Sequence, residues 1–359
     1  MNRTLQLSAL AGVAAIGLGL MPLPAESREY KLTAGSSHPP FVPWVGIIKN
    51  HVVPQSAERV KSLPGGHTIK WTEAYSGTLY GALDTLEAIE QGLADVGWVG
   101  TIFEPEKMPL HNVTFFAPFS GNTDAMVARE IAEELHAKVP AMNEQWTKYN
   151  QVFLGSQVGS SYQLITKFPV NSVADLNGKK LMVGPSFATW VQGTGAVPVR
   201  GAYTEFYNNI QTGIADGAIM DLAGVVPFKV HEIAQHLTIV DFGAPISGGI
   251  TMNKKTFDSM TPEMQKMFRD LGQDYSRMVA EAAVASNKAN YDIIVKAGVK
   301  VSTLAPAERK KWIDQLPDLA GEWIKRNEAK GMPARQVLQV YLQGVRARGG
   351  VPGRDWGSK

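Results

Sequence analysis

The chain of 359 residues contains no cysteine. Disulfides and thiol chemistry are therefore excluded, and packing alone must hold the fold together. An excess of one charge is also missing, since 35 Lys and Arg against 33 Asp and Glu give a formal net charge of +2. No basic block alternates with aromatic residues, so nothing points to a nucleic-acid partner. After Leu20 no run of about 18 apolar residues occurs, and we expect no later membrane span.

Residues 1–27 have the pattern of a secretory signal peptide. Arg3 gives the positive end, residues 5–20 are apolar, and Ala25-Glu26-Ser27 offers small residues at a cleavage spacing. A membrane anchor is the alternative, but the apolar run is short and rich in glycine. We therefore predict that the protein is exported and that the mature chain begins near Arg28.

Strand and helix patterns alternate along the first part of the mature chain. We expect strands at Tyr30–Ala34, His67–Glu73 and Asp95–Val99. Helical periods at Pro43–Val60 and Thr85–Gly92 lie between them. This alternation predicts a doubly wound α/β fold, in which helices cover a largely parallel sheet.

The same alternation restarts near Val152 and ends near Val240, and another strand is expected at Thr251–Asn253. A helical period then continues from Pro262 to about Lys296. A helix of this length is unusual in a globular domain. It is therefore expected to run along two domains.

The most informative segment follows Leu176. Lys180–Val183 is expected to be a strand, and Ser186 to cap the helix after it. Ala196–Val199 is the next expected strand, and Thr204 the cap of the next helix. Two strand-to-helix turns this close together build a ligand cleft, because helix N-termini and strand ends converge there.

These residues resemble the substrate-binding proteins of tripartite ATP-independent periplasmic (TRAP) transporters, of the DctP type. In this segment the shared motifs are Asp175-Leu176-x-Gly178-x-Lys180-Leu181, Gly195-Ala196-x-Pro198-Val199 and Gln211-Thr212-Gly213-Ile214-x-Asp216-Gly217. Earlier in the chain they are Ala74-Tyr75-Ser76-Gly77-x-Leu79, Leu86-Glu87-Ala88-Ile89-x-x-Gly92-x-Ala94-Asp95-Val96-Gly97 and Phe116-Ala117-Pro118-Phe119. Each motif is weak alone, whereas their common order and spacing make a specific pattern.

The resemblance implies a two-domain periplasmic binding protein fold, with a ligand cleft between the domains and a long helix spanning both. Domain I would comprise residues 28–153 with about 242–260, and domain II residues 154–241. The long helix would occupy residues 261–298, and C-terminal helices residues 299–359. The implied role is to capture a small-molecule ligand in the periplasm by hinge closure. The protein would then deliver it to the small and large membrane permease subunits.

Motifs for catalysis, metals and cofactors fail on spacing or context. His231 and His236 are five apart, about 140° around a helix, so they do not share a face as zinc-protease histidines must. They are expected to be solvated instead. Gly193-Thr194-Gly195 lacks the third glycine of a dinucleotide motif and follows a helix. We therefore predict a binding protein rather than an enzyme, with no cofactor and no metal.

One departure from the family concerns the ligand. The family's arginine, which pairs with the ligand carboxylate after the Lys-Leu pair, is replaced by Met182. Methionine cannot form that bidentate, charge-assisted clamp. Arg200, the turn at Pro185-Ser186 or backbone N–H groups could hold a carboxylate instead. Alternatively, an apolar pocket with Asp221 or Glu73 could take an amine, an alcohol or an aromatic compound.

The candidate ligand contacts are side chains at expected strand ends and on the helices that follow them. They are His38, Glu73, Tyr75, Trp98, Met182, Phe187, Trp190, Arg200, Tyr207, Met220 and Asp221. For each aromatic residue the alternative is core packing, and for Arg200 and Glu73 a solvated surface position. The leading hypothesis is a TRAP solute-binding subunit for a small organic acid. A periplasmic enzyme and a sensory binding subunit remain as competing hypotheses.

Overall fold

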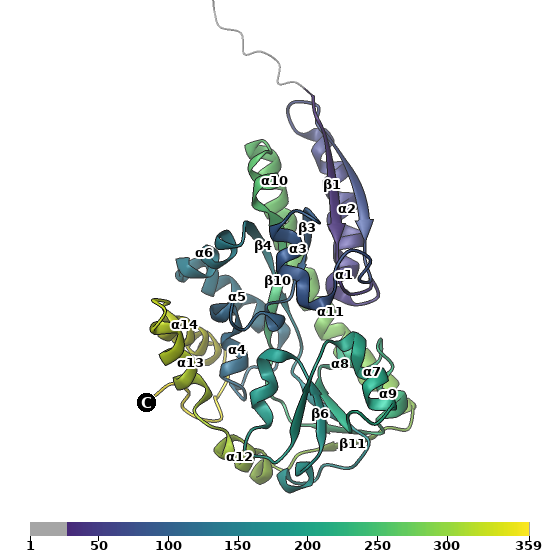
Figure 1. Cartoon of the computed structure of the whole chain (residues 1–359), viewed down its shortest axis with the longest axis vertical. Helices are drawn as coiled ribbons and strands as arrows, with labels where there is room; N and C mark the ends of the chain where they lie inside the picture. Colours follow the sequence, from purple (N-terminus) through teal and green to yellow (C-terminus); the bar gives the residue numbers. More distant parts are fainter. Residues whose placement is uncertain (1–26, 359) are drawn as a thin grey trace, which may run out of the picture.

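The structure is a computed structural model that describes residues 27–358. Apart from Ser27, the predicted signal peptide lies outside the described residues. The described chain is elongated, with β1 and β2 at one end and the second sheet at the other (Figure 1). Among the described helices, none is both long and apolar enough to cross a membrane.

The first sheet has five strands in the order β2-β1-β3-β10-β4. The strands are β1 (Glu29–Gly35), β2 (Thr68–Ala74), β3 (Val96–Val99), β4 (Gln151–Val158) and β10 (Ile246–Asn253). Tyr30, Leu32 and Ala34 of β1 are buried at alternate positions, as a strand period requires. β1 pairs in parallel with β2 and β3, whereas β10 runs antiparallel to β3 and β4.

The second sheet has six strands in the order β11-β9-β5-β8-β6-β7. The strands are β5 (Gln163–Thr166), β6 (Lys180–Val183), β7 (Val197–Arg200), β8 (Gly217–Met220), β9 (His236–Ile239) and β11 (Lys300–Thr303). β6 pairs in parallel with β7 and β8, and β5 runs antiparallel to β8 and β9. The strands of the informative segment therefore lie side by side at one edge of this sheet.

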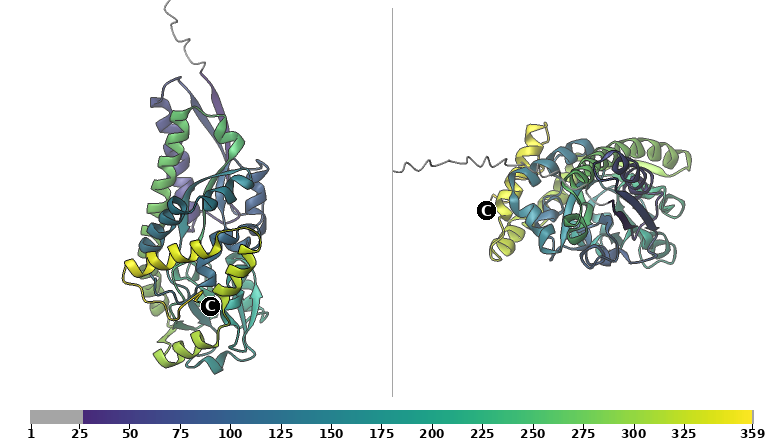
Figure 2. Two further views of the ribbon diagram at one scale, coloured as in Figure 1. Left: turned by 90° about the vertical axis from the view of Figure 1, so that its left-hand side faces the viewer. Right: turned by 90° about the horizontal axis from the view of Figure 1, so that it is seen from above.

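Three connections link the two sheets. Residues 159–162 lead from β4 into β5, and residues 240–245 return from β9 to β10. The third is the helix α11 (Pro262–Lys296), which contacts β4 of the first sheet and α8 (Leu222–Val225) beside the second. Figures 1 and 2 show α11 along the long axis of the molecule. The predicted two-part α/β architecture with a spanning helix is confirmed.

The remaining helices cover the sheets. We call the first sheet with its helices the first part, and the second sheet with its helices the second part. The helices on the first part are α3 (Thr85–Glu90), α4 (Val113–Phe116), α5 (Ala125–Lys138), α6 (Pro140–Lys148) and α10 (Lys254–Asp258). Those on the second part include α7 (Tyr203–Gln211) and α9 (Val230–Ile233). Short 3-10 turns occur at Val60–Ser62, Ala82–Asp84, Thr101–Phe103, Pro109–Asn112 and Val173–Leu176.

The helix predicted at residues 43–60 is broken into pieces. The pieces are α1 (Pro43–Ile47), a π-helical turn at Ile48–Val52, and α2 (Val53–Arg59). Pro54 explains the break, because proline has no N–H to donate to the carbonyl four residues earlier and its ring crowds that turn. A π turn relieves the conflict by adding one residue to the turn.

Two predicted helix caps and one histidine environment differ from the structure. A 3-10 helix (Pro185–Val191) begins one residue before the expected cap, and the Ser186 hydroxyl donates to Ile102 O at 2.6 Å. α7 begins before Thr204, and the Glu205 carboxylate accepts from the Ala202 N–H at 2.9 Å. His231 is buried rather than solvated, and its Nδ1 lies 3.4 Å from Val225 O.

The α11 backbone lies unusually close to β4. A Cβ on Gly272 would lie 2.1 Å from Leu154 O, and a Cβ on Gly155 would lie 2.1 Å from Gly272 O. Only glycine fits at both positions. Beside this crossing, the Ser276 hydroxyl accepts from the Ser156 N–H at 2.8 Å and donates to Gly272 O at 3.0 Å. The small residues allow the contact, and the serine fixes its position.

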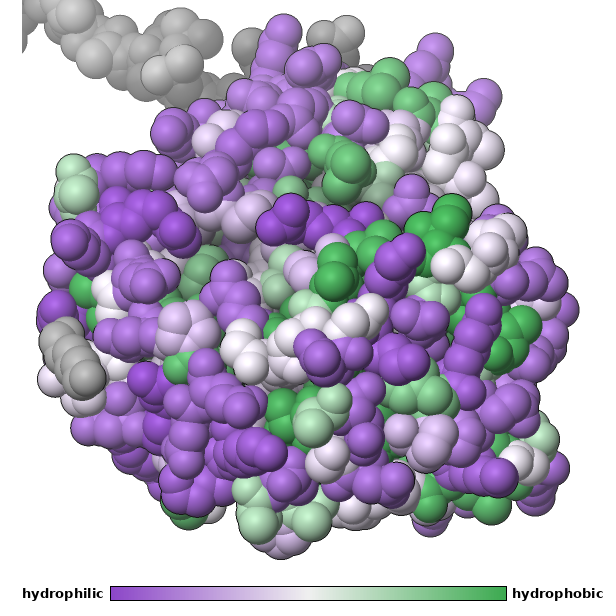
Figure 3. Space-filling model, turned by 60° about the horizontal axis from the view of Figure 1, so that its bottom comes forward, coloured by the Kyte–Doolittle hydropathy of each residue, from purple (hydrophilic) through white to green (hydrophobic). Residues whose placement is uncertain are grey.

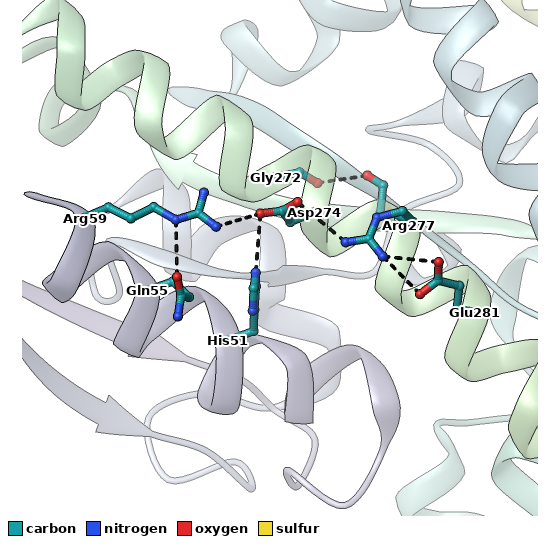
Figure 4. Close-up of polar contacts among 8 residues, drawn as sticks. His51, Gln55, Arg59, Gly272, Asp274, Arg277 and Glu281 are labelled. Atoms are coloured by element: carbon teal, nitrogen blue, oxygen red, sulfur yellow. Dashed lines mark hydrogen bonds and ion pairs between the residues drawn. The ribbon is translucent and has the colours of Figure 1, made fainter.

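α11 is also tied to the N-terminal helices by charge. The Asp274 carboxylate accepts from Arg59 at 3.0 Å and lies 3.5 Å from His51 Nε2 (Figure 4). Burial opposes ionisation, but the hydrogen bonds from Arg59 and His51 hold the pKa of Asp274 below its ordinary value. On the next turn Arg277 pairs with Glu281 at 3.2 Å. These partly exposed pairs add specificity more than stability.

The C-terminal helices are α12 (Pro306–Gln315), α13 (Leu319–Glu328) and α14 (Ala334–Ala347). Each is fixed by a buried polar contact. Trp312 Nε1 donates to Trp190 O at 2.8 Å, Trp323 Nε1 donates to Pro109 O at 3.1 Å, and Tyr341 Oη lies 2.7 Å from Ser120 Oγ. The tail therefore packs on segments of both parts, as the left view of Figure 2 shows for α14 beside α5.

The surface shown in Figure 3 is mainly hydrophilic, with hydrophobic side chains in small groups. Some of the exposed large hydrophobic side chains come from separate elements, for example Leu83, Ile214 and Val351, whereas Val284, Tyr291, Ile293 and Val295 all lie on α11. Scattered exposed apolar residues of this kind are normal for a globular surface.

The close crossing of α11 over β4 makes a first prediction. Gly272→Ala should lower the free energy of unfolding by about 1–3 kcal/mol, because the methyl group must push α11 away from β4. Urea denaturation at constant m-value measures this. Val284→Ala, at an exposed site on the same helix, is the control and should change stability by less than about 0.5 kcal/mol. Equal effects of the two substitutions would contradict the prediction.

Candidate functional site

A pocket with about 490 Å³ of space not filled by protein atoms lies between the two sheets. The first part supplies residues from the loop after β1, from α1, β3 and the turn after β3: His38, Trp44, Trp98, Ile102 and Phe103. The second part supplies residues after β6, β7 and β8 and from α7: Gly184, Phe187, Gly201, Ala202, Tyr203, Phe206 and Asp221. The end of β4, the connection after it and β10 close the pocket with Gln157, Gly159, Tyr162 and Ser247. Both parts of the molecule therefore contribute walls to one pocket.

On the first wall a buried histidine lies among aromatic rings. The His38 ring packs edge-on against Trp98, with centroids 5.0 Å apart, and Trp44 lies 6.0 Å from each of them. Its Nδ1 lies 3.0 Å from Ser37 Oγ. Burial lowers the pKa of His38 to about 4. The ring is therefore neutral at pH 7 and keeps one N–H donor and one acceptor nitrogen.

On the second wall Asp221 is the N-cap of α8. Its Oδ1 accepts from the Gly224 N–H at 3.1 Å and from the Tyr203 hydroxyl at 3.3 Å. Burial raises the pKa of Asp221 to about 6, although these hydrogen bonds oppose the rise. A Cβ added to Gly159 would lie 3.1 Å from Asp221 Oδ2. Oδ2 therefore faces the glycine side of the pocket.

Aromatic rings fill most of the second wall. Tyr162 packs edge-on against Phe187 with centroids 5.1 Å apart, and Tyr203 packs against Phe206 at 5.2 Å. Burial, followed by the nearby Asp221 charge, raises the pKa of Tyr203 well above its ordinary value. Both tyrosines therefore keep their protons at physiological pH. Such walls suit a flat or compact ligand with an apolar face.

Several polar atoms in the walls have no hydrogen-bond partner among residues 27–358. They are Nε1 of Trp44, Nε1 of Trp98, Oε1 of Gln157 and Oγ of Ser247. A buried polar group without a partner costs about 1–3 kcal/mol, which a ligand group can recover. None of the lining residues is lysine or arginine. No cluster of three potential metal ligands occurs within residues 27–358.

Four of the predicted contacts line this pocket: His38, Trp98, Phe187 and Asp221. All four follow or belong to strands, or begin the helix after a strand. These four side chains therefore lie around one pocket. Whether they contact a ligand remains a proposal.

Three other predicted contacts are packed in hydrophobic cores away from the pocket. Met182 is fully buried behind β6, where Asn209 Nδ2 lies 3.7 Å from its sulfur. Trp190 is buried and donates through Nε1 to Phe115 O at 2.7 Å. Met220 is buried in the same core as Met182. Met182 of β6 and Met220 of β8 pack in the core that also contains Ile210 of α7.

The last four predicted contacts lie outside the pocket. Tyr75 is buried, with the Lys49 ammonium 5.9 Å from its ring centre, whereas Glu73 is exposed on β2. Tyr207 is half-buried on α7. Arg200 is exposed and lines an outer hollow of about 950 Å³ between residues 81–84 and 200–205. This hollow adjoins the pocket, since both include Gly201 and Ala202.

Sequence reasoning missed several lining residues. Trp44 lies within the helix predicted at residues 43–60, and Tyr203 precedes the cap predicted for α7. A corrected helix start would have identified Tyr203 as a residue of the first turn after a strand. Gln157 and Ser247 lie in buried strands and give no local signal. Only the crossing of the chain between the sheets brings them to the pocket.

Two further histidines lie outside the pocket, His111 buried and His136 half-buried. His136 stacks on Phe153 with centroids 3.9 Å apart, and His111 packs against Trp146 at 4.8 Å. Burial lowers the pKa of His136 to about 4. Burial, together with the charge of His136, lowers the pKa of His111 well below its ordinary value. Both imidazole rings are therefore neutral at pH 7.

The chain belongs to the family of bacterial extracellular solute-binding proteins, family 7 (DctP), whose sequence model matches residues 58–326. This match covers every strand of both sheets except β1, together with all the pocket-lining residues except His38 and Trp44. The resemblance predicted from the motifs is confirmed, and the family consists of solute-binding proteins rather than enzymes.

Individual relatives are distant. A solute-binding protein of Sulfitobacter sp. (strain NAS-14.1) is 28% identical over 48% of this chain and 53% of its own length. The chain thus matches about half the length of such a curated relative. A TRAP periplasmic solute-binding protein from Sulfitobacter sp. NAS-14.1, solved with bound β-D-galacturonate, has a TM-score of 0.73 at 20% identity, covering 87% of this chain and 99% of that one. A Bordetella pertussis extracytoplasmic receptor binding pyroglutamic acid has a TM-score of 0.72 at 21% identity, covering 87% and 99%. These structures establish the fold.

The neutral histidines make a prediction about pH. Folding depresses the pKa of His38 and His136 from about 6.5 to about 4, and that of His111 below 6.5. Between pH 6.5 and 4 the unfolded chain therefore binds more protons, and stability is lost as the pH falls. Asp221, with its raised pKa, acts in the opposite direction between about 3.8 and 6.

His136→Phe isolates one of these groups. The variant keeps the ring stacked on Phe153 and removes one titration, worth up to about 1.4 kcal/mol per pH unit. Urea denaturation at half-unit steps from pH 4 to 8 should show a shallower slope between pH 6.5 and 4. At pH 8 the histidine is neutral in both the folded and the unfolded chain. The difference in the free energy of unfolding between variant and wild type at pH 8 therefore measures the change in packing alone. Parallel curves below pH 6.5 would show that His136 is not buried as a neutral ring.

Proposed function

We propose that this chain is the periplasmic solute-binding subunit of a TRAP transporter. It would capture a small organic acid by hinge closure and deliver it to the small and large permease subunits. The observation that carries the proposal is the pocket whose walls come from both parts of the molecule. A ligand that contacts both walls favours the closed arrangement over the open one.

Three further observations support this function. The chain belongs to the DctP solute-binding family. Proteins with the same fold are described as binding galacturonate and pyroglutamic acid, which are both small organic acids. The pocket is mostly aromatic, with a few polar groups, which is the usual composition of a small-molecule site.

Closure would use the connections already described. Residues 159–162 and 240–245 are short loops between the sheets, and such loop positions absorb the backbone changes of a hinge. α11 bridges both parts and limits the direction of the motion. The protein would need no cofactor or covalent step for this cycle. Enzymatic turnover therefore forms no part of the proposed function.

Binding is tested by thermal shift on the mature chain, after unfolding and refolding to remove co-purified ligand. The panel is galacturonate, glucuronate, pyroglutamate, orotate and succinate, with neutral polyols and simple amines for comparison. An acid at about 100 times its dissociation constant should stabilise the protein by about 2.7 kcal/mol. For a chain of this size the shift is several degrees.

Closure is measured in the same samples by small-angle scattering and tryptophan fluorescence. The radius of gyration should fall on binding, and the emission of Trp44 and Trp98 should change because both line the pocket. Trp98→Ala should weaken binding at least tenfold through lost contact area. Stabilisation by amines or polyols but by no acid would overturn the proposed substrate class. No response to any compound would overturn the proposed function.

A further inference from the structure

We propose, on the basis of the proposed function, that the pocket selects a small cyclic acid carrying an N–H donor, with the carboxylate on the first wall and the N–H group on Asp221. Pyroglutamate-like lactam acids and cyclic amino acids belong to this class, and sugar acids do not. The proposal rests on the distribution of donors and acceptors between the walls.

The first wall offers donors and no positive charge. The indole nitrogens of Trp44 and Trp98 are buried without partners within residues 27–358, and the two rings lie 6.0 Å apart. The neutral ring of His38 lies beside them, 5.0 Å from Trp98. Neutral N–H groups can hold a carboxylate, but they do not neutralise it as a guanidinium does. The rest of the ligand should therefore lower the net charge of the ligand or form further hydrogen bonds with the pocket.

The second wall offers an acceptor. Asp221 Oδ1 is occupied by the Gly224 N–H and the Tyr203 hydroxyl, whereas Oδ2 lies toward Gly159 at the pocket surface. Gln157 adds a buried Oε1 without a partner within the described chain. Acceptor oxygens require donor groups on the ligand. An N–H beside an apolar ring meets this need and fits the aromatic walls.

Gly159 keeps the space in front of Oδ2 open. A methyl group at this position would lie 3.1 Å from Oδ2 and 3.5 Å from Pro245 Cγ. That separation is too short to leave room for a ligand donor between them. The glycine, located on the connection from β4 to β5, thus leaves access from the pocket to Oδ2.

A ligand of this kind would also drive closure. Its carboxylate would contact Trp44 and Trp98 on the first part, and its N–H group would contact Asp221 on the second. The carboxylate pairs with the donors of the first wall, and the N–H group pairs with the acceptor of the second wall. Only the closed form can therefore bind both groups of the ligand. A ligand lacking one end would bind without holding the two parts together.

The test uses two pairs of cyclic acids in which an oxygen replaces the ring N–H group. The pyroglutamate pair keeps the net charge, whereas the proline pair also loses the positive charge of the ring nitrogen. (S)-Pyroglutamate is compared with (S)-5-oxotetrahydrofuran-2-carboxylate, and L-proline with (S)-tetrahydrofuran-2-carboxylate, by isothermal titration at pH 7.5. In each pair an oxygen replaces the N–H and the ring shape is kept. In the wild type the N–H member of at least one pair should bind at least tenfold more tightly, because the oxygen of its partner faces the Asp221 oxygen unpaired.

Two variants separate recognition from folding. Asp221→Asn keeps a good N-cap, and its amide oxygen should stay on the Gly224 N–H, so its NH2 group replaces Oδ2. The preference within the pair should then disappear or reverse. Gly159→Ala leaves the Asp221 carboxylate in place but fills the space in front of Oδ2. It should therefore reduce the affinity for the N–H member of each pair at least tenfold. Asp292→Asn, at an exposed site on α11, should leave both affinities unchanged.

The outcomes also separate this inference from the proposed function. Equal binding within both pairs, or a preference that survives Asp221→Asn, would overturn the role of Asp221 while acids still bind. Binding of uronates alone would overturn the class of cyclic N–H acids and leave the solute-binding function intact. Failure of every acid in the wider panel would overturn both proposals.

Discussion

The close crossing of α11 over β4 is the constraint on which the rest of the structure depends. Two glycines bring backbone atoms into contact, and Ser276 fixes the register of the helix on the strand. From this point α11 extends to the second sheet, so its position on β4 sets where the second part lies. The pocket takes its walls from both parts, and its shape therefore depends on a packing contact outside it.

The electrostatics of the pocket follow from the burial of two titratable side chains, His38 and Asp221. Burial holds His38 neutral and makes Asp221 harder to ionise. With no lysine or arginine in the walls, hydrogen-bond donors lie mainly on one wall and the principal acceptor on the other. Such a site recognises a ligand through the placement of its donors and acceptors more than through net charge.

Part of this arrangement could be predicted from the sequence. Alternating periods located β6 and α11 at the bounds that the structure shows, and spaced motifs identified the family. His38, Trp98, Phe187 and Asp221 could be found because they lie at or just beyond strand ends. Met182 could not be placed correctly by alignment with the family's arginine. A side chain that cannot pair with a carboxylate is more stable in the apolar core behind β6.

The sequence alone is sufficient to predict most strands and helices, the lack of disulfide bonds and the membership of a solute-binding family. Local periodicity, glycine and proline chemistry and motif spacing are properties of neighbouring residues, so they can be read along the chain. The tertiary structure decided which residues share the pocket. Gln157, Gly159 and Ser247 come from strands and a connection far apart in sequence, and meet only because the chain passes between two sheets. Contacts between distant segments depend on the packing of the whole chain, which no local pattern records.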